Sequence, residues 1–527
     1  MAPPGSAGRL CPRRRAVPFV GNDGWDRGQV GRPGDGGAYV AQETGPGAGA
    51  PAAQDGSGWY ARLIAQAGGR HQLLVVALLS ATLGLAAGYQ TIVGAVAPEL
   101  KHDLRIDNAQ VGLLITAASL LGAATTLPFG VLADRTSRIR LLAICLVSWS
   151  ASVLLAGLAP SFTVLLIAQL ALGAGIGAAT PVVASLIGDI FGSGDRGRIY
   201  GLILTGEFVG ASIALVVAGQ VAAWFTWRAS FLVLVVLGPL VAWGLLRMVP
   251  EPARRQDSVA AAVEGVQHDS ALTSLVARSG TKPYGDQVLR EDPTRWPLWT
   301  AIKYVLTIRT NVLMIIASAL VYYYVAGLQA FIVVFLRGRY DLGQGAATFL
   351  LTFVGVVVVI GTLIAGPLSD RLVARGKIWA RPVVGGLACL FAVAFAAPGL
   401  LIPAFLVGFP IILIGGIGMG AVNPPLDAGR LDIMHSRLWG RAESVRTFLQ
   451  TLGKSSAPLV FGWLSVALSP IGADPNREQG GGAEGLTNAL ILGLVLLVIA
   501  GLLLLVVARQ TYPRDVATAI ASEAATR

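Results

Sequence analysis

The sequence predicts an all-α polytopic membrane protein, with twelve transmembrane helices in two pseudo-symmetric six-helix halves. Of the 527 residues, 54% are hydrophobic and 13% are charged, whereas a soluble domain carries about 25% charged residues. The mean hydropathy is +0.66. Beyond residue 71, apolar runs of membrane-spanning length follow one another, and features of the first six recur in the last six. A soluble enzyme and a disordered protein are therefore excluded.

Each predicted span is an apolar run close to the length of about 20 residues that crosses a bilayer as a helix. Two uncharged stretches are too long for one span, and Pro160–Ser161 and Pro398–Gly399 divide them. The twelve spans are 72–97, 111–133, 139–159, 162–188, 199–222, 228–248, 310–336, 344–368, 382–400, 402–426, 443–468 and 486–508.

The remaining segments are polar or rich in small residues. Residues 1–70 are rich in Gly, Ala and Pro, which predicts a disordered cytoplasmic tail. The halves are 71–248 and 310–508, and 249–309 is a central cytoplasmic segment. Its end mixes aromatic, apolar and basic residues, which favours a helix in the membrane interface over an ordinary linker. We expect residues 509–527 to be a second cytoplasmic tail.

Basic residues predict the orientation, because cytoplasmic loops carry an excess of Lys and Arg. Both termini and the central segment are then cytoplasmic. Arginine far outnumbers lysine, which is typical of GC-rich bacterial genomes, so we expect a multi-pass protein of the plasma (inner) membrane. The loops after spans 2, 4, 8 and 10 and the adjoining turns contain Arg135, Arg138, Arg140, Arg196, Arg198, Arg371, Arg375, Lys377, Arg381, Arg430, Arg437, Arg441 and Arg446. The opposite loops contain Lys101, Arg105, Arg228, Arg337, Arg339 and Arg477.

An internal repeat relates the two halves. Residues 173–181 read GAGIGAATP and residues 416–424 read GIGMGAVNP, 243 positions further on. Asp189 matches Asp432 at the same distance, so the match extends beyond glycines. Two homologous halves imply a pseudo-two-fold axis along the membrane normal, with a substrate site between them near the middle of the membrane.

A second repeated motif follows the second span of each half. It reads GVLADR at 130–135 and GPLSDR at 366–371. The first copy, continued by TSRIR, resembles the loop 2–3 signature of the major facilitator superfamily, and the resemblance covers residues 72–508. Ser137 stands where that family usually has a second glycine. The span 4–5 region also resembles spinster-type lysolipid transporters, although Tyr89 and Ile176 stand where we associate acidic residues with them.

The resemblance implies a secondary active transporter whose halves rock between two states. A glycine at the motif allows close backbone approach between helices, and its aspartate can pair with an arginine when the halves close on one side. The alternative is that these residues only cap loops and set the orientation. The residues to which we assign gating are Gly130, Asp134, Arg135, Arg138, Asp370, Arg371, Asp189 and Asp432.

Charged residues inside the spans are the candidates for coupling, because a charge in the bilayer is costly unless it faces a cavity or a partner. Glu207 lies in span 5. Arg446, Gln450 and Lys454 lie in span 11 at spacing i, i+4, i+8, and therefore on one helix face. The carboxylate could carry a proton and the lysine could bind an anionic substrate. A structural role in helix packing is the alternative for each, and we expect separate charges rather than a direct Glu207–Lys454 bond.

Further polar residues lie in the spans that face the cavity in this superfamily. Each could serve packing instead of binding. Gln169 stands where many proton-coupled drug exporters have an arginine, which argues against that type of efflux. The candidates for the substrate cavity are Tyr89, Gln90, Gln169, Tyr322, Tyr323, Gln329 and Asn423.

The predicted function is transport of a small organic solute by alternating access with proton coupling. The alternatives are a membrane sensor that kept the fold, a spinster-type lysolipid translocator and a membrane enzyme. We expect no catalytic site, because the spans contain no nucleophile–base constellation. We also expect no cofactor, no metal site and no nucleic-acid partner. The partners should be the substrate, the lipid bilayer and protons, and the protein should be a monomer.

Overall fold

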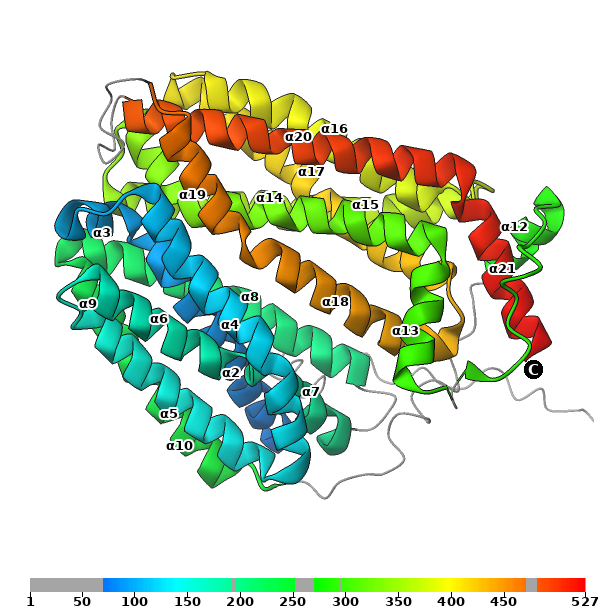
Figure 1. Cartoon of the computed structure of the whole chain (residues 1–527), viewed down its shortest axis with the longest axis horizontal. Coiled ribbons are helices and arrows are strands. Elements are labelled where there is room, and N and C mark those ends of the chain that lie inside the picture. Colours follow the sequence, from blue (N-terminus) through cyan, green and yellow to red (C-terminus); the bar gives the residue numbers. More distant parts are fainter. Residues whose placement is uncertain (1–69, 192–195, 252–269, 294–295, 471–480, 527) are drawn as a thin grey trace, which may run out of the picture. The chain divides into compact units, whose positions relative to one another are not determined.

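The computed structural model describes residues 70–191, 196–251, 270–293, 296–470 and 481–526, and these residues form helices and connecting turns without a strand (Figure 1). They belong to one compact unit that covers residues 59–527. The predicted N-terminal tail lies outside the described residues, and so does the stretch 252–269 of the central segment.

All twelve predicted spans are helical. The first half contains α2 (Arg70–Ala95), α4 (Asn108–Arg135), α5 (Arg138–Gly157), α6 (Phe162–Ile176) with α7 (Ala179–Ile190), α8 (Arg196–Trp224), and α9 (Trp227–Val235) with α10 (Leu237–Met248). The second half contains α14 (Arg309–Tyr340), α15 (Gln344–Ala374), α16 (Ala380–Leu401), α17 (Phe405–Asp432), α18 (Trp439–Ser455) with α19 (Ala457–Ala467), and α20 (Gly481–Gln510).

Eleven of these spans are long and apolar enough to cross a membrane. The twelfth is the pair α18 and α19, which is interrupted at Ser456. Pro458 follows this break at the start of α19, where a missing backbone N–H is tolerated. The sequence of α18 contains the polar stripe, so this span is the least apolar of the twelve.

Glycines of the repeat allow the closest helix packing within each half. A Cβ atom at Gly177 would lie 3.0 Å from the backbone nitrogen of Thr126 in α4. A Cβ at the repeat partner Gly420 would lie 2.7 Å from the carbonyl carbon of Val358 in α15. Small residues permit this approach where lipid provides no hydrophobic drive for association. The repeated sequence therefore produces the same packing of the fourth span on the second in both halves.

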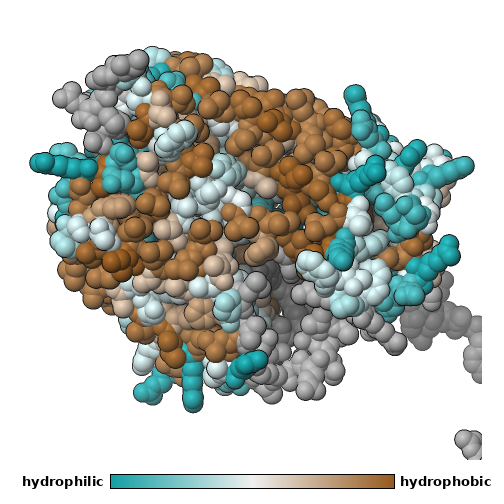
Figure 2. Space-filling model, viewed as in Figure 1, coloured by the Kyte–Doolittle hydropathy of each residue, from teal (hydrophilic) through white to brown (hydrophobic). Residues whose placement is uncertain are grey.

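The outer surface of the bundle is apolar. Figure 2 shows hydrophobic side chains over the middle of the visible face and hydrophilic ones gathered toward its edges. On α8, Phe208 is 71% exposed, and on α15, Leu363 is 68% exposed. Side chains of this kind would be unfavourable in water over so large an area, so these faces are suited to lipid.

The central segment contains two short helices, α12 (Ser270–Ser279) and α13 (Leu298–Thr307). In α13, Ala301 and Val305 are buried, whereas Trp299 is exposed and the ammonium group of Lys303 lies over its ring at 5.9 Å. An apolar inner face with an exposed tryptophan and lysine suits a helix at the membrane surface. A helix is thus present where the sequence predicted one, and its place in the interface stays a prediction.

The two halves meet at the end of the bundle that contains α3 (Ala97–Leu104), here called the α3 end. In Figure 1, α19 of the second half runs alongside α4 of the first half at this end. Four hydrogen bonds cross this contact between the halves, which is here called the seam. Two join α4 to α19: Asn108 donates to the hydroxyl of Ser465 at 2.9 Å, and the backbone nitrogen of Leu459 donates to the hydroxyl of Thr116 at 3.1 Å. In the other two, Gln220 donates to the carbonyl oxygen of Gly345 at 2.8 Å, and Gln344 donates to the carbonyl oxygen of Ala95 at 2.5 Å. An ion pair between Arg337 and Glu99 crosses the seam as well.

Backbone contacts make this seam tight. A Cβ atom at Gly112 of α4 would lie 2.7 Å from the carbonyl carbon of Pro458 and 2.9 Å from the Cα atom of Leu459, both in α19. Real Cβ atoms essentially never approach this closely, and the obstacle is backbone that cannot rotate away. Glycine at this position therefore allows the halves to close at the α3 end.

A methyl group at Gly112 should loosen the seam. The Gly112→Ala change should destabilise the closed seam by about 1–3 kcal/mol, the usual cost of overpacking. We expect a cysteine at Ala457, a fully buried position, to react with maleimide at least about fivefold faster, because each 1.4 kcal/mol shifts an equilibrium about tenfold. The measurement uses detergent-solubilised protein without native cysteines.

The matched control is Gly355→Ala, because a Cβ atom at Gly355 would meet no atom within 4 Å. Its labelling rate should equal that of the parent protein. Equal rates in the two variants would show that Gly112 does not hold the seam closed.

Candidate functional site

The polar stripe of α18 forms a continuous hydrogen-bonded chain. The guanidinium of Arg446 donates to Oε1 of Gln450 at 2.7 Å, and Nε2 of Gln450 donates to the hydroxyl of Ser318 in α14 at 2.9 Å. Arg446 also pairs with Glu443 one turn earlier on its own helix. The i, i+4 spacing read from the sequence thus does bring these side chains together, and it leaves Arg446 and Gln450 engaged by protein partners.

Lys454, at the far end of the stripe, has a different environment. Its ammonium group lies 5.9 Å from the ring centroid of Tyr322 in α14. It also interacts electrostatically with Glu207 of α8, in the other half. Among the described residues, no hydrogen bond or ion pair within 4.0 Å joins Glu207 to Lys454. The two halves thus each contribute one charge of opposite sign, close enough to interact and not bonded.

The other predicted cavity residues are spread over different environments. Tyr89 is fully buried, and its hydroxyl donates to the carbonyl oxygen of Leu234 at 3.1 Å, so it packs within the first half. Gln169 is 2% exposed, and its Nε2 atom has no partner among the described residues. Tyr323 lies 6.3 Å from the ring of Phe461.

Three candidates lie at more open positions. Gln90 and Gln329 are exposed and Asn423 is half-buried. Of the cavity candidates, Tyr322 is the one that a described contact connects to Lys454.

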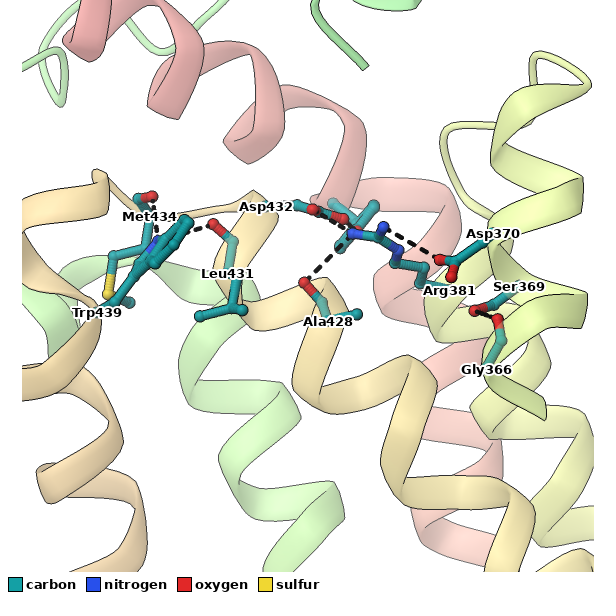
Figure 3. A network of polar contacts seen from close by, with 10 residues as sticks. Gly366, Ser369, Asp370, Arg381, Ala428, Leu431, Asp432, Met434 and Trp439 are labelled. Atoms are coloured by element: carbon teal, nitrogen blue, oxygen red, sulfur yellow. Dashed lines mark hydrogen bonds and ion pairs between the residues drawn. The ribbon is translucent and has the colours of Figure 1, made fainter. Parts of the chain in front are cut away.

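The motif of the second half forms a buried ionic network (Figure 3). Arg381, at the start of α16, forms ion pairs with Asp432 and with Asp370, the latter at 3.3 Å. Its guanidinium also donates to the carbonyl oxygen of Ala428 at 3.3 Å. Arg381 is 9% exposed and Asp432 is 6% exposed. Desolvated charges of this kind need partners, and this network provides them for the two terminal nitrogens of Arg381 from α15 and α17.

Arg371, which the sequence assigned to the motif, is exposed and takes no part in the drawn network. Sequence reasoning included Arg381 among the loop charges and missed its role. The internal repeat could have revealed this role, because Arg138 and Arg140 stand at the start of the third span of the first half, as Arg381 does at the start of the third span of the second half.

The C-terminal segment completes this network. Residues predicted to be a tail form the helix α21 (Tyr512–Ala525), which packs at the end of the bundle opposite the α3 end, here called the α21 end. The hydroxyl of Tyr512 donates to Oδ2 of Asp432 at 2.5 Å, and its ring is fully buried. Burial and the nearby Asp432 raise the pKa of Tyr512 well above its usual value, so the phenol keeps the proton that it donates.

Further bonds attach α21 to neighbouring elements. Asp515 accepts from the backbone nitrogen of Thr310 at 3.2 Å, and Ser522 accepts from that of Leu289 at 3.0 Å. The helix therefore connects the central segment and the start of α14 to the ionic network.

The motif of the first half differs in its partners. Arg138 is 2% exposed and pairs with Glu251 at 3.2 Å, and Glu251 also accepts from the hydroxyl of Ser137 and from the backbone nitrogens of Arg138 and Ile139. Burial raises the pKa of Glu251, but the hydrogen bonds from Ser137 and these backbone groups outweigh it and lower the pKa overall. Arg135 is exposed.

The side chains of Asp134 and Asp189 lie outside the described residues. The close approach that we predicted at Gly130 is absent, because a Cβ atom there would meet nothing within 4 Å. The physical reason is that the described seam between the halves lies at the α3 end, whereas Gly130 lies near the α21 end.

Removing one hydroxyl should test how much α21 supports the network. Tyr512→Phe removes a donor from a buried oxygen of Asp432, which typically costs about 1–3 kcal/mol. We expect the thermal unfolding temperature in detergent, followed by tryptophan fluorescence, to fall by several degrees. Tyr340→Phe is the matched control, because that half-buried hydroxyl makes a long 3.4 Å contact with Gly399. Equal shifts in the two variants would contradict the role assigned to Tyr512.

Comparison with known proteins agrees with this architecture. The sequence profile of the Major Facilitator Superfamily matches residues 78–458. A probable 4-methylmuconolactone transporter of Cupriavidus pinatubonensis is 33% identical over 138 residues, and this match covers 25% of the chain and 32% of that protein. A probable L-galactonate transporter of Escherichia coli is 21% identical over 370 residues, which are 69% of the chain and 77% of that protein.

Solved structures show the same fold. A bacterial homologue of the human lysosomal transporter Spinster, in an inward-facing and unoccupied conformation, superimposes with a TM-score of 0.66 at 22% identity, over 84% of this chain and 97% of that one. Its inward-facing and occupied conformation gives a TM-score of 0.65 at 21% identity over the same shares. The twelve helical spans, the repeated halves and the profile match agree that this integral multi-pass membrane protein belongs to the major facilitator superfamily.

Proposed function

We propose that the protein is a proton-coupled secondary transporter of small organic carboxylates. The observation that supports this most is the pair of opposite charges, Glu207 and Lys454, which lie in different halves within electrostatic range and are not bonded to each other. A lysine that is not bonded to a carboxylate of the protein can bind one from a substrate. The name L-galactonate, carried by one relative, is that of a carboxylate anion.

Coupling follows from competition for Lys454. Without substrate, the positive charge of Lys454 in the second half offsets the negative charge of Glu207 in the first half. When a substrate carboxylate binds the ammonium group, Glu207 loses that compensation in a medium where a bare charge is costly. It then takes up a proton from solution, and the substrate and the proton cross together. Tyr322 supports the lysine through its ring.

The direction of opening follows from the charge of the loops. The excess of arginine places the α21 end in the cytoplasm and the α3 end outside. On that orientation the halves meet on the outer side, which supports the proposal of a state open toward the cytoplasm. In this proposal, the motif residues Asp134, Asp370 and Asp432 stabilise one of the two states. A sensor with the same fold would bind a ligand without moving it.

Two substitutions separate coupling from recognition in proteoliposomes. Glu207→Gln mimics the protonated carboxyl group, so it should keep exchange of L-galactonate down its gradient and lose accumulation driven by a proton gradient. Lys454→Ala removes a charge-assisted contact worth about 1.5–3 kcal/mol, so KM should rise by about 10- to 100-fold. If L-galactonate is not taken up, the same assay uses 4-methylmuconolactone.

The control for Lys454→Ala is Lys303→Ala, which removes an exposed lysine of α13. Its KM should stay within twofold of the parent, about the usual range for an independent site. A Glu207→Gln protein that still concentrates substrate against its gradient would remove Glu207 from coupling. Binding of either compound without any transport would favour the sensor.

A further inference from the structure

Arg430 is a buried cation with free donors. It lies near the end of α17 at 7% exposure, and its Nη2 atom pairs with Asp427 one turn earlier on the same helix. Its Nε and Nη1 atoms are buried and have no hydrogen-bond partner among the described residues. A guanidinium offers a planar fork of N–H groups that fits a carboxylate, and here part of that fork is unused. Leaving buried N–H groups unpaired is unfavourable.

A small cavity adjoins this side chain. It has a volume of about 20 Å³, which is room for one water-sized group. Its walls come from α14, α17, α18 and the turn between the last two, and they are Asn311, Asp427, Arg430, Leu431, Met434, Trp439, Ala442 and Glu443.

Most other donors of this cavity are already used. Nε1 of Trp439 donates to the carbonyl oxygens of Leu431 and Met434, both at 3.1 Å, as Figure 3 shows. Nδ2 of Asn311 donates to the carbonyl oxygen of Val305 at 2.9 Å. The unused donors of Arg430 are therefore the charged ones available to an oxygen atom in this cavity, beside the second N–H of the Asn311 amide.

The neighbouring charges are arranged in pairs. Arg446 lies near enough to repel Arg430, and Glu443 near enough to attract it. Glu443 is already bound by Arg446, and both Glu443 and Asp427 are more than half exposed. Asp427 is thus a partner that can be replaced. Because its carboxylate is more than half exposed, it can be solvated by water when it leaves Arg430. An anion that displaced it could use two or more N–H groups of Arg430 at once.

The cavity and Lys454 lie along one helix. Glu443, Arg446, Gln450 and Lys454 follow each other on α18 at spacings of three and four residues, and therefore on one face. Glu443 and Lys454 are eleven positions apart, which is about 16 Å along the helix. Arg446 and Gln450 on this face are bonded to Glu443 and to Ser318 of α14, so the cavity near the α21 end is a separate place from the pair of charges between the halves.

We propose that Arg430 is a second binding site for the carboxylate of the transported solute, beside the Glu443 end of α18 and separate from Lys454. Asp427 holds the guanidinium when the site is empty, and the carboxylate of the solute takes its place. This inference rests on the proposed transport of organic carboxylates. It adds a residue that the loop charges alone would assign to membrane orientation.

The test measures binding to the full-length protein in lipid nanodiscs, with radiolabelled L-galactonate as the probe, or 4-methylmuconolactone if the parent protein binds that compound more tightly. L-galactose is the uncharged comparison, and inorganic phosphate is the competitor. Arg430→Lys keeps the charge and loses the fork, so Kd should rise at least about tenfold, the loss of one charge-assisted bond. Asp427→Asn removes the competing carboxylate, so Kd should fall severalfold.

A third variant blocks the cavity and leaves Arg430 unchanged. Ala442→Leu places a larger side chain in the cavity and should weaken binding as Arg430→Lys does. This variant keeps the proposal testable if changes at Arg430 impair folding. Arg375→Gln is the matched control, because Arg375 is exposed at the end of α15, and its Kd should stay unchanged.

The outcomes separate the two proposals. A parent protein that binds neither carboxylate would overturn both of them. Carboxylate binding that is the same in the parent, Asp427→Asn and Ala442→Leu proteins would overturn the role of Arg430 and leave transport standing. Variants that change only phosphate binding would show a phosphate site in place of a substrate site.

Discussion

The low polarity of the membrane interior is the constraint on which the rest of this structure depends. A charge placed there must face water, a partner or a site between helices. The spans accordingly contain few charges, and those within them concentrate on α8, α17 and α18. Arg446 is satisfied by Glu443 and Gln450, whereas Glu207 and Lys454 interact across the halves without a bond. In the proposed function, Glu207 and Lys454 are therefore the charges that remain available to a proton and a substrate.

The same constraint explains how the halves can move while each stays intact. Within a half, glycines such as Gly177 and Gly420 bring backbones together, and ionic networks fix the helix ends. Between the halves, the described bonds at the α3 end are few and mostly neutral. Breaking them costs little compared with unpacking a half. In the proposed transport mechanism, rocking about this seam would therefore be the least costly large motion.

Much of the fold could be predicted from the sequence, because hydrophobic length and repeat spacing are local properties. All twelve spans were predicted within a few residues, and the stripe of α18 followed from its spacing. The inward faces of α2 and α6 could not be predicted, since these helices are apolar all round and periodicity then defines no face. Tyr89 and Gln169 were named as cavity candidates because their spans face the cavity in the superfamily, and both are buried within the first half.

Other residues were missed because their roles depend on tertiary contacts. Tyr512 reaches Asp432 from a helix 80 residues away, and Glu251 reaches Arg138 from 113 residues away. Such pairs leave no local pattern. Arg381 and Arg430 looked like ordinary loop charges because the positive-inside rule already accounted for them. The positive-inside rule explains why arginines occur in these loops, but it does not show that Arg381 and Arg430 are buried.

The central claim is that Glu207 and Lys454 act on each other across the halves. A double-mutant cycle tests it directly: KM for L-galactonate, or for 4-methylmuconolactone if that is the better substrate, is measured in the parent, Glu207→Gln, Lys454→Gln and the double variant. Interacting residues should give a combined effect that differs from the product of the single effects by more than about fivefold, since contacting groups couple by about 0.5–3 kcal/mol. Single effects that multiply within about twofold, as for independent sites, would contradict the account.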